Sequence, residues 1–194
     1  TDAAGVGLDG QHSTGPVFAD FDGDGWQDLV IGGIAGSGMR LFRNEADGSF
    51  AEVTESSGIQ IQDVEQNDFS TAFGDPDGDG DLDMYVAHWG AETYIDHLWV
   101  NSGSGQFKAA DAYADLKETY RETDWGFTPV FSDIDSDGRQ DLLIASDYGT
   151  SHVLINQGNL HFENRTTPEI DVRNGMGSAV ADFDNDGDMD WFVT

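Results

Sequence analysis

Four short segments of the sequence repeat one spacing of aspartates, D-x-D-x-D-G-x-x-D, beginning at Asp20, Asp75, Asp133 and Asp182. Carboxylates at alternating positions of a tight loop can converge on one point, and the glycine at the sixth position can adopt the positive φ that a sharp turn requires. Ca²⁺ binds about 6–8 oxygen atoms from carboxylates, backbone carbonyls and water. The spacing therefore predicts four calcium sites, one in each loop.

Each predicted calcium site combines four aspartate side chains with the backbone carbonyl of the seventh loop residue, whose side-chain type varies between loops. Mg²⁺ fits such a site less well, because it prefers a smaller octahedral shell and keeps its waters. Solvated acidic turns without a metal are the alternative, but crowded carboxylates repel one another strongly when no cation is present. The predicted ligands are Asp20, Asp22, Asp24, Trp26 (backbone O), Asp28, Asp75, Asp77, Asp79, Asp81 (backbone O), Asp83, Asp133, Asp135, Asp137, Arg139 (backbone O), Asp141, Asp182, Asp184, Asp186, Asp188 (backbone O) and Asp190.

These loops differ from EF-hand loops, which also begin D-x-D-x-D-G, in the residues that follow. An EF-hand requires a Glu at the twelfth loop position and a helix after it. Here the aspartate at the ninth loop position (the ninth aspartate) is followed by LVIGG, MYVAH, LLIAS or WFVT, which are typical of buried strands. The loops are therefore expected to connect strand to strand. The twelfth residues are all apolar: Ile31, Val86, Ile144 and Val193.

The flanks of the loops repeat as well, so the chain is an array of one structural unit. After each of the first three loops come an apolar run that ends in Asn, then Gly, then Phe, and then a small-residue turn such as TESSG. In the first unit we expect strands at 15–19, 28–33, 39–44 and 49–54, where β-branched and aromatic residues lie between turn residues. No stretch has a sustained helical period, although 110–122 could form a short helix.

A unit of about 40–50 residues with four strands has the size of a propeller blade. We predict an all-β fold, a partial β-propeller of about three and a half four-stranded blades, with a calcium-binding loop between the first two strands of each blade. A solenoid of stacked strands is the alternative. The opening TDAAG matches TESSG, so the chain is expected to start at a repeat boundary and to end within a fourth blade. The predicted blades span 1–53, 54–109, 110–165 and 166–194.

Composition limits the partners. The 194 residues include 8 Lys and Arg against 38 Asp and Glu, and the formal net charge is −30. Such acidity argues against nucleic acid and anionic membrane surfaces as partners, because both are negatively charged. No apolar run approaches the ~20 residues of a membrane-spanning helix, so membrane insertion is not expected. The absence of Cys excludes disulfides, thiolate metal sites and cysteine nucleophiles.

The segments DFDGDGWQDLVIGG, RNEADGSFAEVTESSGI and GMGSAVADFDNDGDMDWFVT resemble FG-GAP/VCBS repeats, and their combination is most similar to the cartilage acidic protein/UnbV-like group. The resemblance covers the whole chain. It implies an extracellular, integrin-α-like β-propeller, of seven blades when complete. It also implies that calcium ions brace the loop between the first two strands of each blade. It does not name a ligand, and the fourth repeat lacks the outer strands of a blade.

Histidines and tryptophans are the other residue types that could bind a metal or a ligand. The histidines lack helical ligand spacing, so strand-packing or loop roles are expected for His12, His88, His97, His152 and His161. Packing between blades is the expected role of Trp89, Trp99 and Trp125, and a sugar-binding face is the alternative. No nucleophile elbow or phosphate-binding glycine loop is present.

The sequence therefore favours a non-enzymatic, secreted or cell-surface propeller segment used for adhesion, assembly or protein interaction, in which calcium is structural. A lectin-like carbohydrate-binding module is the alternative function, with glycans as ligands. An enzyme such as a polysaccharide lyase would need a basic cluster beside calcium, and only 8 basic residues are present. Because about three and a half blades cannot close a ring, we expect a protein partner or self-association to complete the propeller, or more chain to do so.

Overall fold

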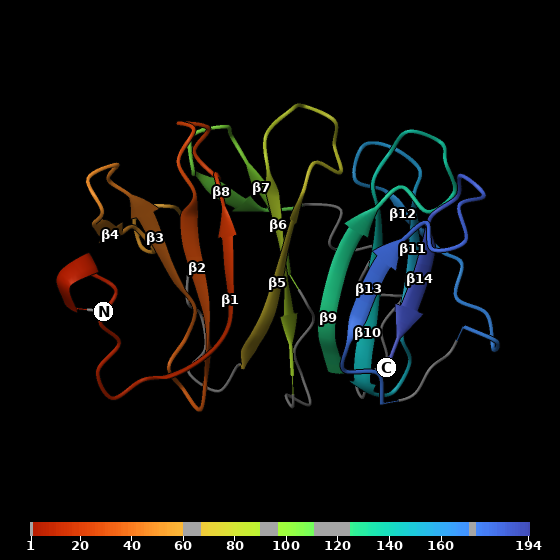
Figure 1. The fold of residues 1–194 in the computed structure, drawn as a ribbon, viewed down its shortest axis with the longest axis horizontal. Helices are drawn as coiled ribbons and strands as arrows, with labels where there is room; N and C mark the ends of the chain where they lie inside the picture. The colour runs from red at the N-terminus through yellow and green to blue at the C-terminus, as the bar shows by residue number, and fades with distance from the viewer. Residues whose placement is uncertain (1, 60–66, 90–96, 111–124, 171–173) are drawn as a thin grey trace.

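The computed structural model describes residues 2–59, 67–89, 97–110, 125–170 and 174–194. Figure 1 shows three four-stranded antiparallel sheets and one two-stranded sheet side by side. A short 3-10 helix, η1 (Asp2–Ala4), precedes the first sheet. The all-β prediction is confirmed. The possible helix at 110–122 falls almost entirely on 111–124, outside the described residues.

Each sheet uses its strands in the order of the chain, with antiparallel neighbours. The strands are β1 (His12–Ala19), β2 (Asp28–Ile34), β3 (Arg40–Asn44) and β4 (Phe50–Glu52); β5 (Asp68–Gly74), β6 (Asp83–His88), β7 (His97–Asn101) and β8 (Phe107–Ala109); β9 (Trp125–Ser132), β10 (Asp141–Tyr148), β11 (His152–Asn156) and β12 (Phe162–Asn164); and β13 (Ser178–Ala181) and β14 (Asp190–Val193).

The sheets are arranged as the blades of a partial propeller. The first strand of each sheet contacts the first strand of the next, β1 with β5, β5 with β9, and β9 with β13. A solenoid would instead hydrogen-bond equivalent strands of successive repeats into one continuous sheet, whereas all the strand pairs of the described residues lie within one repeat. The propeller is therefore the architecture, and the blade boundaries that we drew between the sheets stay predictions.

Burial along the strands follows from stacking blades face to face. All six residues of β6 are buried, and so are the first six of β10, because a neighbouring sheet covers each face. This explains why these strands are continuous apolar runs instead of alternating ones. In β13, by contrast, half-buried and exposed residues alternate, since the third sheet covers only one face.

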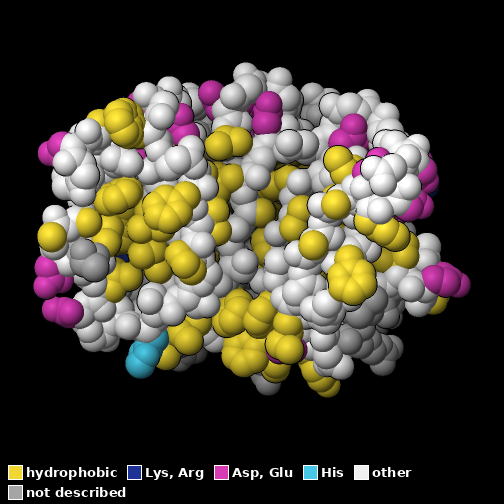
Figure 2. Space-filling model, viewed as in Figure 1, with side chains coloured by type: hydrophobic (Ala, Val, Ile, Leu, Met, Phe, Trp, Pro, Cys, Tyr) yellow, Lys and Arg dark blue, Asp and Glu magenta, His cyan; other side chains and the backbone are white. Residues whose placement is uncertain are grey.

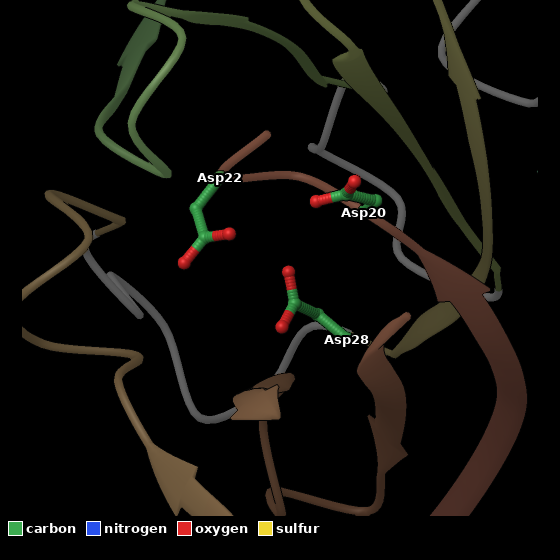
Figure 3. Close-up of side chains that lie close together, drawn as sticks. All are labelled: Asp20, Asp22 and Asp28. Carbon is green, nitrogen blue, oxygen red and sulfur yellow. The ribbon is translucent and has the colours of Figure 1, made fainter. Parts of the chain in front are cut away.

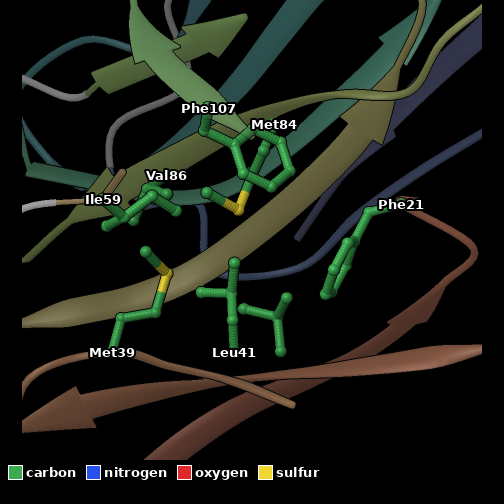
Figure 4. Packing of buried hydrophobic residues seen from close by; sticks show 8 residues of the cluster. Phe21, Met39, Leu41, Ile59, Met84, Val86 and Phe107 are labelled. Atoms are coloured by element: carbon green, nitrogen blue, oxygen red, sulfur yellow. The ribbon is translucent and has the colours of Figure 1, made fainter. Parts of the chain in front are cut away.

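The hydrophobic core lies between the sheets. The first cluster joins sheets one and two, and its side chains interdigitate in Figure 4. Leu41 and Met84, which face each other across this interface, are fully buried. A second cluster around Tyr85 and Leu142 joins sheets two and three, and a third around Leu143 and Trp191 joins sheet three to the fourth repeat. Each repeat thus buries its apolar face only against its neighbours, as in other repeat proteins.

Candidate metal centres

Each Asp-rich loop lies at the same place in its repeat, between the first and second strands, at the upper edge of Figure 1. The first aspartate follows the inner strand directly, and the ninth is the first residue of the second strand. In the first repeat these are Asp20, after β1, and Asp28, at the start of β2. Strand pairing therefore fixes both ends of the loop, with Ala19 opposite Asp28 in the ladder.

The first aspartate holds the turn together by accepting two backbone hydrogen bonds. One carboxylate oxygen accepts from the N–H of the fifth residue at 3.0–3.1 Å, and the other from the N–H of the sixth-position glycine at 2.9–3.1 Å. This pattern is the same in all four loops. The aspartates that accept these bonds are Asp20, Asp75, Asp133 and Asp182.

Two positions of each loop adopt positive φ. The predicted glycines at the sixth position have φ of 89–100°, a region that glycine occupies at little cost. The fourth position is also left-handed, with φ of 61–76°, and it is occupied by Gly23, Gly78, Ser136 and Asn185. The sequence analysis did not single out this fourth position, because Ser and Asn there obscure the pattern.

Three carboxylates converge in every loop. Figure 3 shows Asp20, Asp22 and Asp28 pointing into one space from three sides of the first loop. In each group one oxygen per residue lies within 4.8 Å of the others, which is close enough to share one cation. The other groups are Asp75, Asp77 and Asp79; Asp133, Asp135 and Asp141; and Asp182, Asp184 and Asp190.

Not every predicted ligand joins its group in this arrangement. The fifth-position aspartates Asp24, Asp137 and Asp186 lie outside the triads, and so does Asp83 at the ninth position of the second loop. The carboxylates of all four fifth-position aspartates, Asp79 of the second triad included, accept a hydrogen bond from the N–H of the seventh residue, at 2.8–3.0 Å. Asp137 also pairs with the guanidinium of Arg139. The seventh-residue carbonyls stay predicted ligands.

The ninth aspartate is anchored from two sides. Its Oδ1 accepts from the backbone N–H of the Asn that ends the third strand, at 2.8 Å in the first three repeats. Its Oδ2 accepts from the N–H of the second loop residue in loops one, three and four, at 2.9–3.2 Å. In loop two that residue is Pro76, which has no N–H. The Oδ2 atom of Asp83 is accordingly buried without a hydrogen-bond partner.

Burial disfavours the charged form of these carboxylates. It raises the pKa of Asp28 to about 6 and that of Asp83 to about 7, and the charges of neighbouring aspartates add to both shifts. The pKa values of Asp22, Asp77 and Asp141 are also raised, with burial as the largest cause in each. A bound divalent cation would reverse this effect, because it favours the ionised carboxylate. The all-oxygen donor set and the unpartnered Asp83 oxygen both fit a hard cation such as Ca²⁺.

Two asparagines, whose role the sequence analysis did not assign, tie the loop of one repeat to the third strand of the next. The backbone N–H of Asn101 donates to the ninth aspartate, and its side chain donates to the carbonyl of Phe21 in the preceding repeat at 2.6 Å. Asn156 donates likewise to the carbonyl of Pro76 at 2.7 Å. In the sequence, the recurring Asn at the end of the third strand could have indicated this role, since a buried amide needs hydrogen-bond partners.

The histidines do not form a second metal centre among the described residues. His88 is buried and its Nδ1 lies 3.1 Å from Oδ1 of Asp68, and His152 is buried in β11. His12 and His161 are exposed, and only the backbone of His97 is described.

Two of the five tryptophans lie together at the edge of the propeller opposite the loops. Trp89 and Trp125 pack edge to face with ring centres 5.6 Å apart, and Tyr148 lies 5.2 Å from Trp125. The indole N–H of Trp89 donates to Asp147 at 2.7 Å. Figure 2 shows hydrophobic side chains gathered at this lower edge, where β5 and β9 begin. Trp99 packs instead against the first core cluster.

Comparison with known proteins gives one family. The model of the FG-GAP-like repeat matches residues 20–86, 75–144 and 133–193. Each match begins at the first aspartate of one loop, and together they cover most of the chain. Comparison with curated proteins gives no match.

Two solved structures resemble the chain. One is an Agrocybe aegerita lectin described as recognising non-reducing terminal N-acetylglucosamine, with 21% identity and a TM-score of 0.44 over 76% of this chain and 36% of the lectin. The other is the V. cholerae biofilm matrix protein Bap1, with 21% identity and a TM-score of 0.48 over 94% of this chain and 28% of Bap1. The chain thus spans about a third of the length of these structures.

Proposed function

The chain belongs to the FG-GAP-like repeat family, and we propose that it is a calcium-braced propeller segment that serves adhesion, assembly or protein interaction outside the cell. The observation that carries the proposal is the convergence of three carboxylates in every one of the four loops. In this proposal Ca²⁺ is structural. It neutralises the crowded aspartates and joins the end of the inner strand to the start of the second strand.

The second loop adds a specific argument for a cation. Asp83 is fully buried, and its unpartnered Oδ2 would leave a desolvated negative charge in the core. Such a charge is costly unless it is paired, protonated or bound to a metal. A Ca²⁺ ion held by Asp75, Asp77, Asp79 and Asp83 would satisfy that oxygen, with the Asp81 carbonyl and water completing the shell.

An extracellular setting suits this chemistry. Calcium sites of extracellular modules bind with dissociation constants of roughly 10⁻⁴–10⁻³ M, and an abundant external supply of the ion keeps them filled. No described helix is long and apolar enough to cross a membrane. We further propose that the chain is not an enzyme, because its loops offer carboxylates for a cation and its 8 Lys and Arg residues are few. Exposed connecting loops would then carry the partner site.

The test is calcium stoichiometry by elemental analysis after equilibrium dialysis against calcium. We expect four ions per chain, and about three for the Asp20→Asn and Asp133→Asn variants, each of which removes one loop's first carboxylate. The exposed Asp9 lies outside the loops, so Asp9→Asn should keep all four ions. A chain that holds no calcium at millimolar concentrations would disprove the proposal.

Glycan binding is the second candidate function, and the aromatic cluster at the opposite edge favours it. Tyr148 is 54% exposed beside Trp125, and Asp147 offers a hydrogen-bond acceptor next to the two indoles. Aromatic rings that combine an apolar face with polar groups are suited to amphipathic ligands. A glycan array tests this function. Glycan binding that is lost in the Tyr148→Ala variant, but kept in the Trp26→Ala variant at the edge with the Asp-rich loops, would establish it. An array that shows no glycan binding by the unmodified chain would rule out this function.

A further inference from the structure

The third Asp-rich loop differs from the other three in its charge. Each loop holds four or five aspartates in nine residues, and a basic residue occurs only in the third, where Arg139 stands at the seventh position. Four aspartates and one arginine give the third loop a formal charge of −3, against −4 for the first loop and −5 for the second and fourth. An arginine stays protonated in proteins, so this difference is permanent.

The Arg139 side chain is held against its own loop by two contacts. Its Nη2 pairs with Oδ2 of Asp137, the fifth-position aspartate. Its Nε donates to the backbone carbonyl of Asn156 at 2.7 Å, at the end of the neighbouring strand β11. A planar guanidinium can make both contacts at once, so the positive charge is positioned beside the loop.

These contacts occupy both carboxylate oxygens of Asp137. Oδ1 accepts from the backbone N–H of Arg139 at 2.9 Å, and Oδ2 is taken by the guanidinium. In the first and fourth loops, Asp24 and Asp186 accept the equivalent backbone bond on Oδ1, at 2.8 and 3.0 Å, whereas no described residue donates to their Oδ2. The oxygen that stays available to a cation in those loops is therefore already paired in the third.

The other arginines of the described ranges pair with glutamates that lie outside the Asp-rich loops. These pairs are Arg40 with Glu52, Arg43 with Glu45 and Arg165 with Glu163. The contact between Arg139 and Asp137 is thus a feature of the third loop and not a general property of the surface.

We propose that Arg139 is a built-in counter-ion that makes the third loop the weakest calcium site of the chain and the one whose stability depends least on calcium. This inference rests on the proposed calcium role. A calcium ion held by Asp133, Asp135 and Asp141 would lie beside a positioned positive charge, which repels it. When calcium is scarce, the same charge offsets part of the repulsion among the aspartates of the loop.

Four glycine amides report on the four loops separately. The N–H of the sixth-position glycine donates to the first aspartate of its loop, so its amide NMR signal should shift when that loop binds calcium. In a calcium titration of the unmodified chain, we expect the signal of Gly138 to shift at a higher calcium concentration than those of Gly25, Gly80 and Gly187. In Arg139→Gln, the midpoint of the Gly138 shift should fall by about tenfold, with the other three midpoints little changed.

Arg43→Gln is the matched control. It removes the same charge from a side chain of similar exposure, 45% against 43% for Arg139, but from a pair outside the loops. The Gly138 midpoint should stay unchanged in this variant. Arg139→Lys, which keeps a positive charge next to Asp137, should bind calcium at the third loop nearly as weakly as the unmodified chain.

Melting temperatures separate a counter-ion from a packing role. In chelator, Arg139→Gln should melt below the unmodified chain, and in saturating calcium it should melt at the same temperature or above. Equal losses with and without calcium would assign Arg139 a packing role and overturn the proposal. A Gly138 midpoint that stays or rises in Arg139→Gln also overturns it and leaves the proposed calcium role standing, whereas four glycine signals that do not shift at millimolar calcium overturn both.

Discussion

The ninth aspartates show how one neighbouring residue changes the chemistry of a carboxylate. Asp28, Asp141 and Asp190 each receive a backbone N–H on Oδ2, whereas Asp83 receives none because Pro76 occupies the donor position. Burial is the largest cause of the raised pKa of both Asp83 and Asp28, and Asp83, at about 7 against about 6 for Asp28, also lacks the backbone hydrogen bond from the second loop residue that lowers the pKa of Asp28. The second loop should therefore depend on its cation more than the others do.

Replacing Pro76 with Ala should stabilise the calcium-free chain. The new N–H can reach Oδ2 of Asp83 as its counterparts do in the other loops, and a hydrogen bond to a charged group contributes roughly 1.5–3 kcal/mol. Loss of the proline's rigidity costs roughly 0.4–1 kcal/mol. We expect a net gain of about 1 kcal/mol in urea unfolding after calcium removal. Phe183→Ala, an exposed residue at the same position of the fourth loop that already has this N–H, should give no such gain. A loss of stability in Pro76→Ala would contradict the argument.

The raised pKa of Asp83 predicts a pH dependence of the calcium-free chain. A carboxyl whose folded-state pKa lies above its ordinary value of 3.8 stabilises the fold fully below that value. This contribution is lost as the pH rises toward about 7. The melting temperature without calcium should therefore fall between pH 5 and pH 8, and the melting temperature of the Asp83→Asn variant should fall less.

Calcium should reverse this trend, because the ion requires the charged carboxylate. The saturated chain is expected to lose stability as the pH falls below 7. Melting curves at four pH values, with and without calcium, provide the measurement. An Asp83→Asn variant with the same calcium-free pH profile as the unmodified chain would show that another group controls it.

The aspartates themselves could be predicted from spacing, but their grouping could not. A repeat of D-x-D-x-D-G-x-x-D indicates which side chains can reach one point, and the structure brings three of them together in every loop. Which three depends on rotamers and on backbone donors, as Asp79 replaces the ninth aspartate in the second loop. The role of Asn101 was also hidden, since its partner, Phe21, lies 80 residues earlier in the sequence.

The asparagine at the end of the third strand is the element-scale feature that locks one repeat to the next. The Asn156 side chain donates to Pro76 and Gln140 carbonyls and accepts from the N–H of Gly158. All three partners lose a hydrogen bond in Asn156→Ala, of which the bond to Pro76 is buried and the other two are part-buried. At roughly 1–3 kcal/mol for each unsatisfied group, partly offset by water, we expect a loss of about 3 kcal/mol in urea unfolding.

Asn44→Ala is the matched control for this prediction. Asn44 is half-buried and has the same local bonds, to Gln27 and Ala46, but no bond to a preceding repeat. Its replacement should cost about 1 kcal/mol in dilute solution. Equal losses for the two variants would show that the local turn, and not the contact between repeats, determines the stability.

The strands could be predicted from the sequence more closely than their surroundings. Expected strands at 15–19 and 28–33 correspond to β1 and β2, because turn residues mark their ends. Burial on both faces of β6 and β10 reflects packing between sheets, which an apolar run alone does not distinguish from a buried helix.

At the scale of the whole molecule, the repeat spacing predicted the propeller, while the different exposure of equivalent side chains became visible only in three dimensions. Phe183 and Phe21 stand at the same loop position in the sequence, and nothing there tells that one is 74% and the other 2% exposed. Exposure depends on whether a neighbouring repeat is present. The formal net charge of −30, by contrast, is a property of the whole molecule that follows from the sequence alone.

This charge determines how the chain should respond to the removal of calcium. Under the proposed function, four Ca²⁺ ions would add eight positive charges and change −30 to −22, at the places where carboxylates lie closest together. Each filled site stabilises the native state by roughly 2.7 kcal/mol at a hundredfold excess over its dissociation constant. Chelation should therefore lower the melting temperature by well over ten degrees, since about 1 kcal/mol corresponds to roughly 2–4 °C for a chain of this size.

Sodium chloride should partly replace calcium, and only in the chelated chain. Screening shortens the Debye length from about 10 Å at 0.1 M to about 3 Å at 1 M, which weakens the repulsion among unneutralised aspartates. We expect the melting temperature in chelator to rise with salt, while that of the calcium-loaded chain changes little because its loops are already neutralised. Potassium chloride serves as the control for a sodium-specific effect. Equal salt responses with and without calcium would show that the repulsion lies in the general surface charge and not in the four loops.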